Sequence, residues 1–152
     1  MADTHPAPDR RATGRTETCG LLWRLLAMAY DTAAIVALWL FATALAMIAG
    51  FRELSVVRDP VYALYLLLVW FAYLAWCWHR GGMTLGMRAW RIRIEDEAGG
   101  LPGWTPCAVR FAASLLSAAA AGVGFAWSLF DREKRTWHDI LSHTRLLRQR
   151  RG

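Results

Sequence analysis

Residues 32–51 read TAAIVALWLFATALAMIAGF and contain no charged side chain over twenty positions. Two later blocks share this property: residues 60–78 (PVYALYLLLVWFAYLAWCW) and residues 111–130 (FAASLLSAAAAGVGFAWSLF). A mainly apolar stretch of about 18 or more residues is long enough to cross a hydrocarbon core about 30 Å thick. These blocks predict an integral membrane protein, not a soluble domain.

The overall composition agrees with that class. The 152 residues suit one domain, and 56% are hydrophobic while 20% are charged. Ordinary globular chains are about 45–50% apolar and about 25% charged. The first block begins only after a polar segment and is longer than the apolar core of a signal peptide, so we do not expect its removal.

Charge and cysteine usage restrict the partners. The net charge is +6, and the basic residues flank the apolar blocks. Lysine and arginine there set orientation and meet anionic lipid headgroups, so we expect the bilayer as partner and no nucleic acid. Cys19, Cys77 and Cys107 have neither disulfide-framework nor metal-ligand spacing, so no metal or cofactor is expected.

The chain divides into a membrane domain and two tails. Residues 1–18 are polar and contain two prolines, which predicts a disordered cytoplasmic tail. Residues 19–147 form the expected membrane domain, and residues 148–152 form a basic C-terminal tail.

Local patterns predict the elements of the domain. A first helix is expected over residues 21–50. Asp59-Pro60 favours the start of a second helix that ends near residue 78. Thr105-Pro106 similarly favours the start of a third helix. Residues 136–139 match a capping box.

A short strand is expected between the second and third apolar blocks. Trp90, Ile92 and Ile94 alternate with charged residues, the period-two pattern of a half-buried strand. We place this small β element on the cytoplasmic side. Gly82 and Gly86 have GxxxG spacing but lie outside the apolar blocks, so helix pairing through them is not expected.

The third apolar block is rich in small residues. Ala113, Ser117 and Ala121 are spaced by four, as are Ser114, Ala118 and Gly122 in the offset register. Small residues at this spacing let helices approach closely in lipid. In the alternative interpretation, they only lower the hydrophobicity of the block.

The topology of the third block is open between two arrangements. If it crosses fully, the lysines and arginines divide nine against nine between the two sides. If it enters and returns, sixteen lie on the side of the two tails and two on the other. The positive-inside tendency favours the second arrangement, with residues 10, 90 and 150 cytoplasmic and residue 55 outside. Twenty-odd residues cannot cross twice, so this arrangement requires a re-entrant or interfacial segment broken near Gly122 and Gly124.

Two charged residues lie in the first helix. Arg24 and Asp31 are seven positions apart and share a helical face. An ionisable residue inside a membrane helix is a functional candidate because it is costly unless paired or solvated. In the alternative, residues 32–51 alone span the membrane, Arg24 snorkels to the interface and Asp31 lies among the headgroups.

Three motifs, in order, resemble the RDD family. These are WRLLAMAYD at residues 23–31, GGMTLGMRAWRIRIEDEAG at residues 81–99, and DREKRTWHDILSHT at residues 131–144. The resemblance covers residues 21–147. It implies a family arginine at Arg24, a first aspartate at Asp31, and a second at Asp139, with Asp131 as the alternative.

The resemblance also implies supporting positions: Thr84, Gly86, His138 and Thr144. The chain departs from the family at two points. Ser142-His143 replaces an alanine-glycine pair that is frequent in the family. The β-branched final strand is replaced by RLLRQRRG, which leaves open whether this segment pairs with the strand at residues 90–95.

The sequence lacks signs of catalysis. It contains no GxSxG, no HExxH and no Gly-rich phosphate loop, and His138 and His143 are five apart, which does not place two ligands on one helical face. We therefore expect no enzymatic activity.

The expected protein is an all-α membrane protein with two transmembrane helices, a third Ala/Ser/Gly-rich segment that is re-entrant or spanning, and a small β element. The resemblance implies a multi-pass protein of the bacterial inner membrane that takes part in transport of an unidentified ligand or ion. Arg24, Asp31 and Asp139 would form its polar centre. The alternative function is a non-transporting scaffold or assembly partner. Either function predicts a homo-oligomer or a partner subunit, because so few segments rarely enclose a pathway alone.

Overall fold

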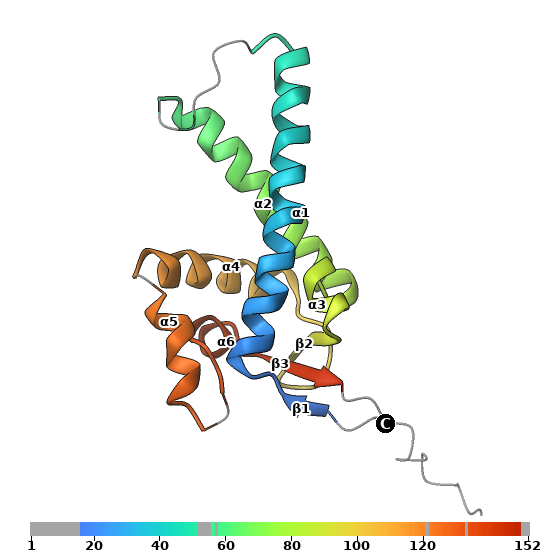
Figure 1. Cartoon of the computed structure of the whole chain (residues 1–152), viewed down its shortest axis with the longest axis vertical. Helices are drawn as coiled ribbons and strands as arrows, with labels where there is room; N and C mark the ends of the chain where they lie inside the picture. The colour runs from blue at the N-terminus through green and yellow to red at the C-terminus, as the bar shows by residue number, and fades with distance from the viewer. Residues whose placement is uncertain (1–15, 52–55, 57, 121, 133, 150–152) are drawn as a thin grey trace, which may run out of the picture.

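The computed structural model describes residues 16–51, 56, 58–120, 122–132 and 134–149. It is mostly helical and has a small sheet (Figure 1). In chain order the elements are β1 Thr16–Thr18, α1 Leu21–Ile48, α2 Pro60–Gly81, α3 Leu85–Ala89, β2 Ile92–Asp96, α4 Trp104–Ala119, α5 Val123–Ala126, the 3-10 helix η2 Trp127–Leu129, α6 Trp137–Leu141 and β3 Thr144–Gln149.

Helices α1 and α2 form a hairpin that is long and apolar enough to span a membrane. Their 28 and 22 residues correspond to about 42 and 33 Å at 1.5 Å per residue. Helix α2 begins as expected, because the Asp59 carboxylate accepts hydrogen bonds from the N–H groups of Val61 and Tyr62. It ends at Gly81, three residues beyond the expected end, and Gly82 closes it in the left-handed conformation.

Helix α4 lies across the long axis of α1 (Figure 1). The chain then bends by 108° into α5 and η2. Gly122 adopts a φ of 80° at this bend, which confirms the expected break. The expected Thr105 cap is wrong: α4 begins at Trp104, with Gly103 as its cap and no capping side chain.

Close contact between α4 and α5 depends on small residues. Ser117 is fully buried, and a Cβ added to Gly124 would lie 2.8 Å from the Ser117 Cβ. Ala113 is also buried, whereas Ala121 lies outside the described residues. The small-residue pattern therefore serves close helix packing within this chain.

The sheet joins three distant parts of the chain at the end of the molecule away from the α1–α2 loop (Figure 1). Its order is β1-β3-β2, with both pairs antiparallel. Residues 16–18 therefore belong to a strand, not to the disordered tail that we expected for residues 1–18. Residues 1–15 lie outside the described part of the chain.

After Thr144, strand β3 forms without the β-branched residues of the family pattern. It extends to Gln149, so residues 148–149 belong to the sheet and not to a separate tail. His143, at the family's glycine position, has a φ of 51°, which explains why glycine suits that position. The adjacent strand β2 begins at Ile92, two residues later than expected, and Trp90 is instead the C-terminal cap of α3; within the strand the expected alternation is present, because Ile92 and Ile94 are both fully buried. They belong to the main core, which also contains Ala75, Trp78 and Cys107.

Candidate functional site

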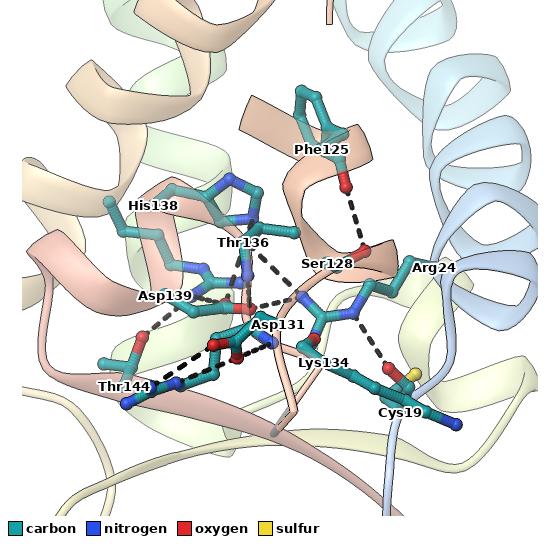
Figure 2. Close-up of polar contacts among 12 residues, drawn as sticks. Cys19, Arg24, Phe125, Ser128, Asp131, Lys134, Thr136, His138, Asp139 and Thr144 are labelled. Atoms are coloured by element: carbon teal, nitrogen blue, oxygen red, sulfur yellow. Dashed lines mark hydrogen bonds and ion pairs between the residues drawn. The ribbon is translucent and has the colours of Figure 1, made fainter. Parts of the chain in front are cut away.

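A buried ion cluster links α1, α4 and α6. We use this name for Arg24, Arg110, Thr136, His138, Asp139 and Thr144. Asp139 accepts hydrogen bonds from two arginines: Arg24 Nη1 on its Oδ2, and Arg110 Nη1 at 2.6 Å on its Oδ1. Figure 2 shows Arg24 reaching from α1 to Asp139 and Thr136. The carboxylate is 1% exposed and the arginines are each 5% exposed, so the two cations and the single anion face one another inside the protein and not in solvent.

Local folding fixes the position of Asp139. Thr136 and Asp139 form the expected capping box, and the Thr136 N–H donates to Asp139 Oδ2 at 3.0 Å. The α6 capping box therefore aims the carboxylate at the two arginines. Although burial alone raises the pKa of Asp139, the Arg110 and Arg24 guanidinium groups hold it well below its ordinary value.

The two arginines differ in how completely they are bonded. Arg24 uses all three guanidinium nitrogens, because Nε donates to the Cys19 carbonyl at 3.1 Å and Nη2 to the Lys134 carbonyl at 3.0 Å. Arg110 bonds through Nη1 alone, to Asp139 and, at 2.7 Å, to Thr144 Oγ1. Within the described residues, its Nε and Nη2 have no acceptor.

His138 completes the cluster as a neutral group. Its Nε2 lies 2.9 Å from Thr136 Oγ1, and its ring centroid lies 4.9 Å from that of Phe125. Burial, followed by the nearby Arg110 charge, lowers the pKa of His138 to about 3. Its Nδ1 has no hydrogen-bond partner within the described chain.

Asp31 occupies a second site with Thr84 and Gly86. Its two oxygens accept hydrogen bonds from Thr84 Oγ1 at 2.5 Å and from the Gly86 N–H at 2.8 Å. Thr84 also caps α3, accepting from the Met87 N–H at 3.2 Å. The threonine and glycine of the family motif thus hold the first aspartate, which is 8% exposed.

Tight packing at Gly86 brings α3 against α1. A Cβ at Gly86 would overlap the carbonyl oxygen of Ala27 and lie 2.9 Å from Asp31 Cγ. Our expectation that the Gly82–Gly86 pair plays no part in helix pairing is wrong for Gly86. The α3 backbone must approach α1 closely to donate its N–H to Asp31.

The expected polar centre therefore consists of two sites. Arg24 and Asp139 pair directly, as expected, whereas Asp31 bonds to the α3 segment and not to Arg24. The snorkelling alternative requires exposed polar heads, but the protein buries both Arg24 and Asp31. Asp131, the alternative second aspartate, accepts instead from Arg135 at 3.2 Å.

Our sequence reasoning missed Arg110. It is the single charged residue between positions 98 and 130. We began the third apolar block at residue 111, which treated Arg110 as a boundary residue. The rule that we applied to Arg24 and Asp31 would have identified it, since an isolated charge in an apolar segment is a functional candidate.

A cavity of about 240 Å³ connects the two sites. It lies between α1, α2 and α4, and its lining is mostly apolar. The charged, hydroxyl and imidazole side chains in its wall are Arg24, Asp31, Thr32, Thr84, Arg110, Ser114 and His138. In the described residues, no group of three or more histidine, cysteine, aspartate or glutamate side chains is arranged to hold a metal ion.

No curated protein and no solved structure gives a significant match. The family model of the RDD family matches residues 18–143, which include Asp31, Asp139 and both arginines of the buried ion cluster. Because that match covers most of the chain, the protein belongs to the RDD family, whose members are membrane proteins.

Proposed function

We propose that the protein is a component of a membrane transport system and that the cavity is the binding site for its ligand or ion. The observation that supports this role is a cavity between membrane helices whose wall contains both Asp31 and Arg110. Ionisable groups between membrane helices are typical of ion, proton or substrate pathways, because burying a charge there costs free energy unless it is paired or solvated. The role is not enzymatic.

The proposed topology has two crossings, with the sheet in the cytoplasm of a bacterial cell. Strands β1 and β2 both pair with β3, so the segments before α1, after α2 and after α6 meet in one sheet. A sheet of this kind cannot straddle a bilayer, because open sheet edges do not occur in hydrocarbon. The segment containing α4 and α5 would then enter and return. Sixteen of the eighteen lysines and arginines would lie on the cytoplasmic side.

Flux measurement tests the transport role. Purified protein in liposomes, with a trapped pH-sensitive dye, is expected to pass protons when a salt gradient is imposed. Asp31→Asn should abolish this flux while the protein still folds, because an asparagine can accept from the Gly86 N–H and donate to Thr84. Asp59→Asn is the matched control, since Asp59 caps α2 and asparagine caps equally well.

The second candidate is a scaffold or assembly partner without transport. It is favoured by the large side chains that α1 leaves uncovered, including Leu40 at 67% and Ile48 at 84% exposure. These could face lipid, a second copy or a partner subunit. Absence of flux under all imposed gradients, together with copurification of a membrane partner lost on Leu40→Ala, would favour the scaffold and contradict transport.

A further inference from the structure

We propose that the cavity binds a single-chain amphiphile with a carboxylate head, such as a long-chain fatty acid, and that Arg110 holds the carboxylate. This proposal rests on the binding site proposed above and names the class of ligand that the site binds. It can be tested without measuring transport.

The first observation is that the guanidinium group of Arg110 is only partly hydrogen-bonded within the described residues. Its Nη1 is engaged by Asp139 and Thr144, while Nε and Nη2 have no acceptor in the described part of the chain. Nε–H and the adjacent Nη2–H form a planar fork that matches the two oxygens of a carboxylate. Arg110 lines the cavity, and its Cζ lies 5.6 Å from the Trp78 ring centroid.

The second observation is the surplus of positive charge and of donors beside the cavity. Arg24 and Arg110 share a single carboxylate, Asp139, and His138 is neutral. A buried cation with only part of a counter-charge is costly, so an anion is favoured there. The indole N–H groups of Trp70 and Trp78, which also line the cavity, have no acceptor among the described residues.

Asp31 does not supply the missing anion. Each of its oxygens already accepts from the α3 segment, at Thr84 and Gly86. Asp31 also lies about 10 Å along α1 from Arg24. Arg24 and Arg110 both pair with the carboxylate of Asp139 instead.

The third observation is the polarity of the cavity along α1. Arg24 and His138 line its end near the sheet, Asp31 and Thr32 line the α1 wall beyond Arg24, and Ile35 lies eleven residues from Arg24, about 16 Å along the helix. Trp70 and Leu115 also line the cavity. An acid head at Arg110 would therefore leave its chain directed towards the spanning part of the hairpin.

The size of the cavity favours one chain. Sites for drug-sized ligands measure about 300–1,000 Å³, and this cavity, at about 240 Å³, is smaller. It suits a single alkyl chain better than a phospholipid with two chains.

The test is a titration of the full-length protein, purified in nonionic detergent, with palmitate, in which native mass spectrometry counts the bound adducts. Wild-type protein should bind one palmitate, and hexadecanol, which has the same chain without the charge, at least tenfold more weakly. Arg110→Lys keeps the charge beside Asp139 but removes the fork, so palmitate affinity should fall roughly tenfold or more.

A pair of neighbouring variants tests the location. Ala118 lines the cavity and Ala119 does not, and both are exposed on α4. Ala118→Trp should abolish palmitate binding by filling the cavity, while Ala119→Trp should leave it unchanged, with equal melting temperatures for both.

Three results would overturn the proposal. Equal binding of hexadecanol would mean that no head group is recognised. Unchanged binding in Ala118→Trp would mean that the chain lies elsewhere. Tighter binding of a lysophospholipid than of palmitate would assign the site to a phosphate head. Absence of proton flux in liposomes, with palmitate binding retained, would contradict the proton-transport role and not this binding proposal.

Discussion

At the scale of single residues, Asp139 is the centre of the buried ion cluster. One carboxylate serves two guanidinium groups from two helices and a backbone N–H of its own capping box. Charge-assisted hydrogen bonds of this kind are strong, and removing one partner leaves another charge buried. The consequences of substitution should therefore depend on how many charges are left unpaired.

Asp139→Leu should be the most damaging single substitution in the cluster. It leaves Arg24 and Arg110 without a carboxylate, at an expected cost of about 3–5 kcal/mol. Arg24→Leu should cost less, because Asp139 still pairs with Arg110. The double variant should be no worse than Asp139→Leu. Melting temperature and yield in detergent measure these effects, with the exposed Glu97→Leu as the matched control. A greater loss in Arg24→Leu than in Asp139→Leu would contradict the shared carboxylate.

The cluster should also make the protein sensitive to acid. Burial lowers the pKa of His138 to about 3. Below about pH 6.5, His138 therefore takes up a proton in the unfolded chain but stays neutral in the folded chain. The stabilising contribution of the neutral His138 is fully present above that pH. As the solution is acidified, the free energy of unfolding falls by up to about 1.4 kcal/mol per pH unit. The lowered pKa of Asp139 acts in the same direction at still lower pH.

Thermal melts between pH 7.5 and 4.5 would measure this dependence. His138→Gln should flatten it, whereas His143→Asn should not, because His143 is 77% exposed. Asparagine tolerates the left-handed backbone at that position. A wild-type melting temperature that is independent of pH over this range would contradict a neutral buried His138.

At the scale of elements, the short helix α3 holds Asp31 in place. Thr84 caps the N-terminus of α3 and donates to Asp31, and Gly86 lets the α3 backbone approach α1. The α1–α3 contact is therefore both a packing interface and the source of Asp31's hydrogen bonds.

Gly86→Ala should separate α3 from α1. The new methyl group would overlap the Ala27 carbonyl, so the protein should lose about 1–3 kcal/mol of stability and the hydrogen bond from Gly86 to Asp31. Gly81→Ala is the matched control, since a Cβ there meets nothing within 4 Å. Detergent melting temperatures compare the two, and equal values would contradict the close approach at Gly86.

At the scale of the whole molecule, the sheet determines which segments can lie on one side of the membrane. Strand β3 pairs with both β1 and β2, so the segments around residues 18, 97 and 145 should be on the same side. Residue 56 lies in the loop between α1 and α2 and should be on the other side.

Cysteine accessibility in intact cells tests this arrangement. Single cysteines at Thr18, Glu97, Arg145 and Val56, all exposed, would be introduced after replacement of the native cysteines. Only the cysteine at position 56 should react with an impermeant reagent from outside. Labelling at position 145 from outside would mean that the third apolar segment crosses fully.

The sequence alone determined the class of the molecule and most of its elements. Uncharged blocks about as long as a bilayer core is thick, the Asp59-Pro60 cap, the Thr136–Asp139 capping box and the alternation around Ile92 are local signals, and each corresponds to an observed feature. The RDD resemblance, now supported by the family match, also identified Arg24 and Asp139, which pair in the structure.

Only the tertiary structure decided how the charged residues are distributed. Spacing along α1 put Arg24 and Asp31 on one face. Their side-chain partners, however, lie far away in the sequence: Thr136 and Asp139 are 112 and 115 positions from Arg24, and Thr84 is 53 positions from Asp31. Arg110 joined the cluster because α4 lies across α1 and carries that side chain to Asp139 (Figure 1). Strand β3 formed despite its weak local pattern, because β1 and β2 both provide edges for pairing. Contacts between segments so distant in the chain depend on how helices cross and strands pair, which periodicity and capping signals do not encode.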